Sequence, residues 1–482
     1  MNLRVRRKSY GTGRKIPWKW GYSCAGRRKS MKEGNLREPN TELCRRMLSP
    51  HNLEVAISNV KRNKGSAGID GMEVSEIDEY MEDNWTRIEE QILARTYKPK
   101  PVKRVEIPKE NGGVRLLGIP CVIDRVIQQA MVQVLQPVFE PTFSEYSYGF
   151  RPGRSAEDAV RKAQEYMAEG YRYVVDLDLS KFFDTVNHDF LMSQVDRTLE
   201  DKDIRRLIYV YLKSGVMTNG CMMETEEGTP QGGPLSPLLS NIYLTPYDKE
   251  LEKRGHRFVR YADDCNIFTK SKYSAKRVKE SVIRFLENRM KLKVNMEKTE
   301  ARRAVGSSFL GFTFTTTKSR DGLGMCRPKQ KKIEKFEQCI REITERSRGV
   351  SAERMISELN AYLRGWISYY ARGNFKGWLR DEASWIRRRV RQYLWKLWKK
   401  AGARKQHLLE LGVPKWWTTK YAKGLSSNRY WRMSNALRSA ITNDILQEKL
   451  GMLNIEAYYE AKHKERMEWD RTYNSQLEFV FI

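Results

Sequence analysis

The sequence is poor in the residues that bind zinc or form disulfides. It contains only five histidines and seven cysteines, and no two cysteines stand in Cys-x-x-Cys spacing. This pattern argues against a zinc ribbon, a zinc finger and a metal-dependent His-Asn-His nuclease module. The odd number of cysteines and the lack of a recognisable secretory leader favour a reducing, cytoplasmic location.

Long apolar runs are also missing, and acidic residues are scarce. No run approaches the roughly 18 apolar residues of a membrane-spanning helix, so we expect no membrane partner. The 482 residues carry 89 Lys and Arg against 60 Asp and Glu, a net charge of +29. This excess indicates a polyanionic partner, with a solubilising basic surface as the alternative. Aromatic residues often lie beside basic ones, as in 395–400, which favours RNA or single strands because rings stack on unpaired bases.

Composition changes along the chain suggest its organisation. Residues 1–46 carry fourteen Lys or Arg and three acidic residues, which predicts a flexible basic arm; an organellar transit peptide is the alternative. A globular pattern follows, with a helical apolar period before a glycine-rich loop at 63–71. Beyond a change near residue 325 the chain becomes mostly helical and basic, with an apolar helical stripe between 356 and 370.

Periodicity within the globular part predicts specific elements. Residues 102–119 alternate around Asn-Gly-Gly and predict a hairpin, and 127–138 carry a helical apolar stripe. A strand is expected at 171–183, a helix at 275–292 and two short strands within 305–326.

The most informative motif is Tyr261-Ala262-Asp263-Asp264, which stands between two short apolar runs. This arrangement predicts a β-hairpin with two carboxylates at its tip. Adjacent carboxylates repel each other unless they are protonated or share a cation, and a hard divalent ion suits oxygen ligands. An ordinary surface Asp-Asp turn is the alternative for this motif taken alone.

A third carboxylate can join this pair. In the predicted strand, Leu177 and Leu179 fall on one face, whereas Asp176, Asp178 and Ser180 fall on the other. If the strand and the hairpin share one antiparallel sheet, Asp178 meets the pair at its edge. Three carboxylates form a ligand set for two Mg²⁺ ions in phosphoryl transfer.

Two cations flank the turn of the 102–119 hairpin, namely Lys109 and Arg115. Paired cations on a hairpin suit the grip on an incoming triphosphate. An ordinary solvated hairpin explains them equally well without the other motifs.

Four motifs together carry a family resemblance. They occur in the order 178–184, 228–236, 258–264 and 309–312. In this order they resemble a reverse transcriptase of the group II intron type, closest to the bacterial class C branch that lacks an endonuclease domain. The similarity covers about residues 47–460 and adds Tyr146 to Pro152, the 63–71 loop and Leu363 to Tyr370.

The resemblance implies an α+β fold, a right-hand polymerase. Fingers and an antiparallel-sheet palm would occupy 47–325, with an N-terminal extension at 47–95. An all-α thumb, or maturase domain, would occupy 326–425, and a nucleic-acid-binding tail 426–482.

The resemblance also implies roles for single residues. Asp178, Asp263 and Asp264 would hold two Mg²⁺ ions, helped by the Leu179 carbonyl, and Mn²⁺ is a candidate substitute. The implied contacts to the incoming dNTP come from Lys109, Arg115, Phe183, Gln231 and Lys298. Phe183 would exclude a ribose 2′-hydroxyl, and Lys298 would neutralise pyrophosphate, although it is one Lys among many.

Further roles concern nucleic acid. Phe309, Leu310, Gly311 and Phe312 would form a primer grip, with a core strand pair as an equally good explanation. Arg387, Arg388 and Arg389 would bind RNA, with a solvated helix face as the alternative.

The expected function is therefore an RNA-directed DNA polymerase that also binds its intron RNA for splicing and mobility. Its partners would be the group II intron RNA, an RNA template, a DNA target and primer, and dNTPs, in the bacterial cytoplasm or nucleoid. A splicing-only maturase and a reverse transcriptase of a defence, retron or CRISPR-associated system are the alternatives. The sequence leaves open whether the chain forms a homodimer.

Overall fold

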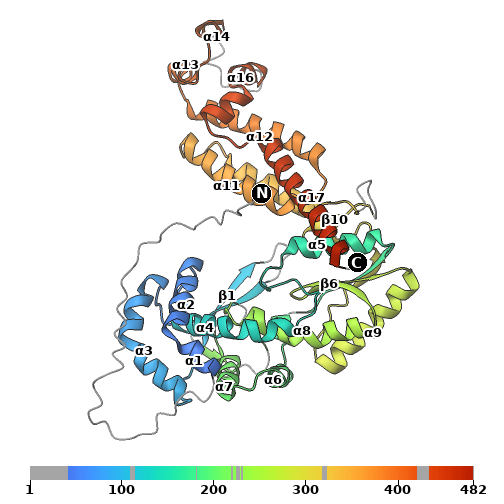
Figure 1. Cartoon of the computed structure of the whole chain (residues 1–482). Coiled ribbons are helices and arrows are strands. Elements are labelled where there is room, and N and C mark those ends of the chain that lie inside the picture. Colours follow the sequence, from blue (N-terminus) through green and yellow to red (C-terminus); the bar gives the residue numbers. More distant parts are fainter. Residues whose placement is uncertain are drawn as a thin grey trace, which may run out of the picture.

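The computed structural model describes residues 42–108, 114–180, 182–218, 221–223, 228, 232–316, 323–420 and 434–480. In Figure 1 these residues form a lower body of helices and sheets and an upper, mostly helical region. No helix within these ranges has the length and apolar character needed to cross a bilayer.

The N-terminal part of the body consists of four helices, which share one apolar core, and a small sheet. The helices are α1 (Glu42–Leu48), α2 (Pro50–Asn63), α3 (Ile77–Leu93) and the central α4 (Val122–Phe139), with short 3₁₀ turns at Val74–Glu76 and Glu140–Thr142. The sheet has the order β2-β1-β4-β5 and contains β1 (Val102–Pro108), β2 (Val114–Ile119), β4 (Val216–Thr218) and β5 (Cys221–Met223). Strands β1 and β2 pair antiparallel from Lys103 opposite Ile119 to Pro108 opposite Val114. The hairpin predicted at 102–119 is thus confirmed.

A second sheet, antiparallel throughout, has the order β6-β7-β3-β8. Its strands are β3 (Tyr173–Leu177), β6 (Arg257–Tyr261), β7 (Asp264–Thr269) and β8 (Glu300–Arg303). Side chains alternate between its faces. Val175 and Leu177 join one apolar core, whereas Val174 joins another that continues into the C-terminal helices. Apolar cores therefore cover both faces of the sheet. The sheet thus fixes the positions of the residues that directly follow its strands.

Helices complete the two cores around this sheet. On the side of Leu177 these are α6 (His188–Asp196), α7 (Lys202–Leu212), α8 (Ser236–Lys253) and α9 (Lys272–Met290), and on the side of Val174 it is α5 (Ala156–Ala168). Helix α9 confirms the helix predicted at 275–292 and begins slightly earlier.

The C-terminal region begins with a three-stranded sheet and continues as helices. The strands are β9 (Ser308–Phe309), β10 (Phe312–Phe314) and β11 (Cys326–Pro328), and β11 pairs with β10, so this sheet crosses residue 325. The helices are α10 (Gln330–Ile343), α11 (Ala352–Tyr370), α12 (Lys376–Leu397), α13 (Ala401–Glu410), α14 (Lys415–Lys420), α16 (Ser434–Ala440), a π turn (Ile445–Lys449) and α17 (Ile455–Val480).

The segment expected to be a separate tail is part of the C-terminal core. Helix α17 runs along α12 towards α5 (Figure 1). Its residues Ile455 and Tyr459 are buried in the same core as Leu359 and Ile386 of α11 and α12. The described part of the tail thus completes the helical domain.

The sequence predicted the presence of helices better than it predicted the residues at which elements begin and end. In α4 the predicted stripe is buried, except that Val138 at its end is only partly so. The strand predicted at 171–183 ends at Leu177, because the backbone changes partner there: Leu179 forms a bridge with Val294, and the Ser180 N–H donates to the Lys293 carbonyl at 2.8 Å. Helix α1 also begins at Glu42, inside the segment expected to be a basic arm.

Candidate active site

Two of the predicted metal ligands are brought together by strand register. Asp178 directly follows β3, and Asp264 is the first residue of β7. The antiparallel pairing of these strands places Leu177 opposite Cys265. One residue after Leu177 on β3 and one residue before Cys265 on β7, Asp178 comes opposite Asp264. Both lie on the face opposite to Leu177 and Cys265, because side chains alternate along a strand.

Negative charge accumulates at this sheet edge. Burial, followed by the charges of Asp176, Asp263 and Asp178, raises the pKa of Asp264 to about 8, and Lys329 acts in the opposite direction. Burial and the neighbouring carboxylates both disfavour the ionised form of Asp264, and a nearby cation would favour it. The arrangement therefore favours a bound cation.

Two basic side chains partly balance the acidic ones. Lys298 Nζ lies 3.4 Å from Asp178 Oδ2, and Arg302 Nη2 donates to Asp176 Oδ2 at 2.6 Å. The Lys298 side chain is 66% exposed, so its pair with Asp178 is a weak surface ion pair. The structure thus places Lys298 beside the carboxylates, as the position predicted for it requires.

The donor atoms at this edge suit a hard divalent cation, because they are carboxylate oxygens from adjacent strands and their turn. Within the described ranges, no three acidic, histidine or cysteine side chains already surround one point as a metal site would require. The uncompensated charge around Asp264 is what a cation would neutralise. The charge and donor type of Asp178 and Asp264 therefore fit a divalent cation, and the ligand set of Asp178, Asp263 and Asp264 stays a prediction. Leu179, the fourth expected ligand, has a buried side chain beside Asp178.

The turn between β6 and β7 is held from beneath. Ala262 has a φ of 56°, in the left-handed region, and its carbonyl accepts a hydrogen bond from Arg260 Nη1 at 2.8 Å. Gly149 approaches so closely that a Cβ there would collide with the Ala262 nitrogen. Asn241 Nδ2 in turn donates to the Gly149 carbonyl at 2.9 Å. This buried scaffold sets the position of Asp264.

Phe183 lies in a short 3₁₀ turn (Phe182–Asp184) that follows Asp178. The Phe183 ring is partly buried and meets Phe182 edge to face at 5.3 Å, and Phe182 meets Tyr243 of α8 at 6.0 Å. The Gly228 N–H donates to the Val186 carbonyl at 2.8 Å, which fixes Gly228, the first residue of the 228–236 loop, beside this turn. Phe183 thus stands five residues after Asp178 and close to Gly228.

The same loop also contacts the N-terminal hairpin. Gly232 has a φ of 133°, and a Cβ there would collide with the Gly118 carbonyl oxygen of β2. Only glycine allows this approach, which brings the strand that carries Arg115 to the loop. The side chain of Arg115 and all of Lys109 and Gln231 lie outside the described residues. Their contacts to a triphosphate stay predictions.

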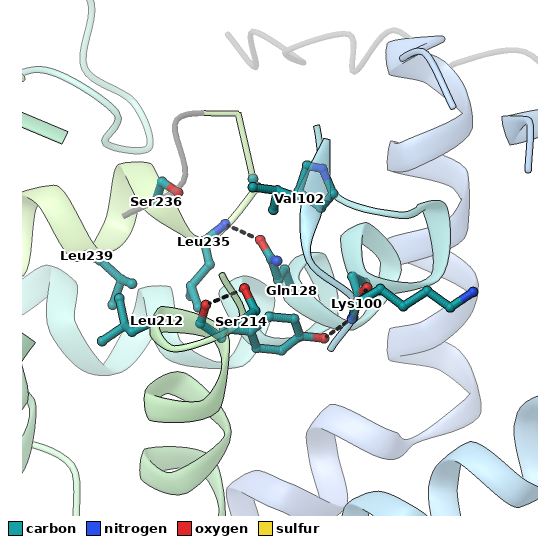
Figure 2. Close-up of a pocket in the computed structure, with 12 residues that line it drawn as sticks. Lys100, Val102, Gln128, Leu212, Ser214, Leu235, Ser236 and Leu239 are labelled. Atoms are coloured by element: carbon teal, nitrogen blue, oxygen red, sulfur yellow. Dashed lines mark hydrogen bonds between the residues drawn. The ribbon is translucent and has the colours of Figure 1, made fainter. Parts of the chain in front are cut away.

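A small cavity lies beneath the loop, lined among others by Asp124, Gln128 and Tyr211 (Figure 2). Its volume of about 20 Å³ suits one water molecule, not a nucleotide. Leu235 N–H donates to Gln128 Oε1 at 3.5 Å, and Tyr97 donates to Asp124 Oδ1 at 2.7 Å. Burial raises the pKa of Asp124 to about 6. This cavity is a structural feature beneath the site.

The predicted primer grip forms a tight turn between β9 and β10. Phe309 and Phe312 are buried and stand opposite each other in the strand pair, so their side chains serve the core. The turn residues Leu310 and Gly311 have φ values of 49° and 83°. The Leu310 carbonyl accepts a hydrogen bond from the Tyr369 hydroxyl at 2.9 Å, which ties the turn to α11.

The three arginines predicted to bind RNA differ in their surroundings. Arg387 pairs with both carboxylate oxygens of Glu456 at 3.0 Å, and Arg389 donates to Thr344 Oγ1 at 2.6 Å. Both are engaged within the protein. Arg388 is exposed and lines a cleft of α12.

The sequence did not single out several residues that shape the site. Asp248, Asn241 and Arg260 form the buried support of the turn, and Tyr369 holds the primer-grip turn. A charged residue on the apolar face of a predicted helix, such as Asp248, is a usable signal, because buried charges require partners. Lys329 carried no such signal, since the chain has many lysines.

Two protein families match the chain over these regions. Residues 107–314 match the family described as "Reverse transcriptase (RNA-dependent DNA polymerase)". Residues 333–412 match "Group II intron, maturase-specific domain". The first range contains the three aspartates, and the second lies within the C-terminal helices. The fold is therefore that of a right-hand polymerase with an antiparallel-sheet palm and a helical thumb, as predicted.

Three curated relatives are similar to this chain. Protein YkfC of Escherichia coli (strain K12) is 32% identical over 321 residues, which cover 58% of this chain and 84% of YkfC. Group II intron-encoded protein LtrA of Lactococcus lactis subsp. cremoris is 31% identical over 330 residues, 55% of each chain. Retron Mx65 reverse transcriptase of Myxococcus xanthus is 28% identical, over 55% of this chain and 59% of that protein. The chain thus spans only a little over half of the length of LtrA. The two family matches and the coverage of YkfC show that the chain belongs to the group II intron-encoded reverse transcriptases and maturases.

Proposed function

We propose that this chain copies an RNA template into DNA by metal-assisted nucleotidyl transfer. In that reaction the primer 3′-oxygen bonds to the α-phosphorus of a dNTP, and the bond to pyrophosphate breaks. The observation that carries the proposal is the register of β3 and β7, which puts Asp178 opposite Asp264 beside the turn that contains Asp263.

Asp178, Asp263 and Asp264, with the Leu179 carbonyl, are the proposed ligands of two Mg²⁺ ions. When bound, the ions lower the pKa of the primer hydroxyl and neutralise the leaving group. The protein itself contributes the fixed positions of these carboxylates. The carboxylates are fixed by the sheet and by the Arg260 contact beneath the turn, so little rearrangement is needed for catalysis.

The incoming dNTP is proposed to lie between the 102–119 hairpin and the palm. Lys109, Arg115 and Gln231 would contact it from the hairpin and loop side, and Lys298 from the palm. Phe183 would pack against its sugar. The close approach of Gly232 to β2 supports this arrangement, because it joins the hairpin to the loop.

The thumb, at 326–425, is proposed to bind intron RNA, together with the 426–482 segment, whose described part shares the apolar core of the thumb. This binding would promote splicing and, with a DNA target and primer, mobility of the intron. The net charge of +29 and the maturase-specific match support the proposal. We propose the cytoplasm as the location.

Primer extension with purified protein, an RNA template, a DNA primer, dNTPs and Mg²⁺ tests this function. We expect extension by the unchanged protein and none by Asp178→Ala or by Asp263→Ala with Asp264→Ala, while RNA affinity changes less than about twofold. Omission of Mg²⁺ should also abolish extension. Binding of RNA without any addition of deoxynucleotides would contradict the polymerase proposal and favour a splicing-only maturase.

The RNA partner is tested separately by competition between a group II intron RNA and an unrelated structured RNA of the same length. We expect preference for the intron RNA. Extension without such preference would contradict the maturase part and favour a retron or defence function.

A further inference from the structure

A cleft on the helical thumb is lined by residues of α12 and of the segment around α16, far along the chain from the aspartates. Figure 1 shows α16 beside α12 in the upper region. Its volume is about 290 Å³, at the small end of the range for ligand sites. This size suits one nucleotide and is too small for a paired helix. The described residues that line it come from 381–392 and 435–443.

The walls of the cleft carry positive charge. Arg387, Arg388, Arg391 and Arg438 line it, and Asp381 is the one acidic residue among its described lining residues. The charge of Arg387 is balanced by Glu456. Arg388 and Arg438 are exposed, so their guanidinium groups are accessible from solvent. Arg388, Arg391 and Arg438 therefore carry more positive charge than Asp381 can balance.

Arg391 distinguishes this cleft from an ordinary basic surface. It is 6% exposed, its Nε donates to the Ile441 carbonyl at 2.6 Å, and its Nη2 donates to Asn443 Oδ1 at 2.8 Å. Both acceptors are neutral. Burial, followed by the charges of Arg387 and Arg438, lowers the pKa of Arg391 to about 10. A buried guanidinium with neutral acceptors and two cationic neighbours is stabilised by an anion.

Neutral hydrogen-bonding groups complete the walls. Ser384, Gln392, Asn435 and Asn443 line the cleft beside the arginines. Side-chain amides offer both donors and acceptors, which match the edges of unpaired bases. Trp385 also lines the cleft, and the guanidinium of Arg389 lies 5.3 Å from the centre of its ring. The lining therefore combines groups for a phosphate with groups for a base.

We propose that this cleft binds a single unpaired nucleotide of an RNA loop, with the phosphate held by Arg388, Arg391 and Arg438 and the base among the amides. The inference rests on the proposed binding of RNA by the thumb. It adds that the thumb recognises an unpaired nucleotide in a concave site, in addition to the duplex backbone.

Two RNAs and three variants test the cleft. The RNAs are a hairpin with an unpaired loop, prepared with each of the four bases in the loop, and the same stem closed into a continuous duplex. The variants are Arg388→Gln, Arg438→Gln and their combination. Arg380→Gln is the control, because Arg380 is an exposed arginine of the same helix outside the cleft lining. Arg391 is left unchanged, since its buried bonds also support the fold.

We expect each cleft variant to weaken binding of the hairpin loop by about tenfold, as for loss of one charge-assisted bond, and to change duplex binding less than about twofold. The double variant should lower the slope of log affinity against log salt by about 0.7, which corresponds to one phosphate. Arg380→Gln should leave both affinities close to the starting values.

The inference would be overturned if the cleft variants lost equal affinity for the hairpin loop and for the duplex. It would also be overturned if their loss of affinity were no larger than that of Arg380→Gln. Thermal unfolding of each variant identifies loss of fold. Primer extension on an RNA template is measured in parallel with the unchanged protein and with Arg380→Gln, which should extend equally. If the unchanged protein extends no primer, the polymerase proposal fails while the loop preference still decides the role of the cleft.

Discussion

Arg260 and Asp248 form a doubly hydrogen-bonded ion pair inside the palm. Arg260 Nε donates to Asp248 Oδ1 at 2.7 Å and Nη2 donates to Oδ2 at 2.6 Å, and the two side chains are 1% and 0% exposed. The third nitrogen, Nη1, donates to the Ala262 carbonyl and to Asn241 Oδ1. The pair therefore connects α8 to the turn that carries Asp263 and Asp264.

Asp248→Asn should strongly destabilise the protein, because it leaves a buried guanidinium without its counter-charge. We expect the free energy of unfolding to fall by about 3–5 kcal/mol, measured by urea denaturation. Glu250→Gln in the same helix is the control. Its partner Arg254 is 29% exposed in its side chain, so its loss should change stability by less than about 1 kcal/mol. Similar effects of the two variants would show that the buried pair does not support the palm.

Tyr369→Phe should weaken the hold on the primer without affecting the binding of RNA. The change removes the hydrogen bond to the Leu310 carbonyl and keeps the ring, which stacks on Phe312 at 5.8 Å. We expect the KM for primer to rise about fivefold, equivalent to about 1 kcal/mol. Tyr273→Phe, at a tyrosine that is 71% exposed on α9, is the control and should leave the KM unchanged. An unchanged KM in Tyr369→Phe would remove this tyrosine from primer positioning.

Phe183→Val should relax the discrimination against ribonucleotides. The ring of Phe183 is anchored against Phe182, and a smaller side chain leaves room for a 2′-hydroxyl. We expect the ratio of kcat/KM for dNTP over rNTP to fall on the order of tenfold to a hundredfold, measured by single-nucleotide incorporation. Phe183→Tyr, which keeps the ring, should retain the discrimination. Equal ratios in all three proteins would exclude Phe183 from sugar selection.

Asp124 should make stability depend on pH. Burial raises the pKa of Asp124 to about 6 from an ordinary value of 3.8, so the unfolded chain releases this proton at lower pH than the folded one. Stability due to this group is full below its unfolded pKa and decreases as the pH rises through 6. Asn cannot titrate. The difference in free energy of unfolding between the unchanged protein and Asp124→Asn should therefore fall by about 2 kcal/mol from about pH 4 to about pH 7. A difference that stays constant or rises would contradict the raised pKa.

The sequence was sufficient to predict those elements whose local residue pattern agrees with the fold. The hairpin around Asp263 and Asp264 was predictable because two apolar runs flank a short polar turn. The helical stripe of α11 was predictable because its period is regular and its residues are buried. The register that brings Asp178 to Asp264 depended on the assumption that both belong to one sheet, which the structure confirms.

The remaining features depend on contacts that are distant in the sequence. The strand of Asp178 ends early because the chain changes partner to residues near Val294, and alternation alone does not show this. Arg387 resembled an RNA-binding residue by its local charge, but its partner Glu456 stands on α17. Local charge alone therefore does not show which arginines are already paired within the protein, and the binding of RNA by this run stays a prediction.

The proposal that Asp178 and Asp264 hold a shared divalent cation is tested most directly by Mn²⁺ binding, measured by electron paramagnetic resonance. The sample contains an RNA template, a primer that lacks a 3′-hydroxyl and a matching dNTP, so the complex forms without turnover. We predict bound Mn²⁺ in the unchanged protein and in Lys298→Gln, and at least about tenfold weaker binding in Asp178→Asn and in Asp264→Asn, since each removes a charged ligand. Equal Mn²⁺ affinity in all four proteins would contradict the account.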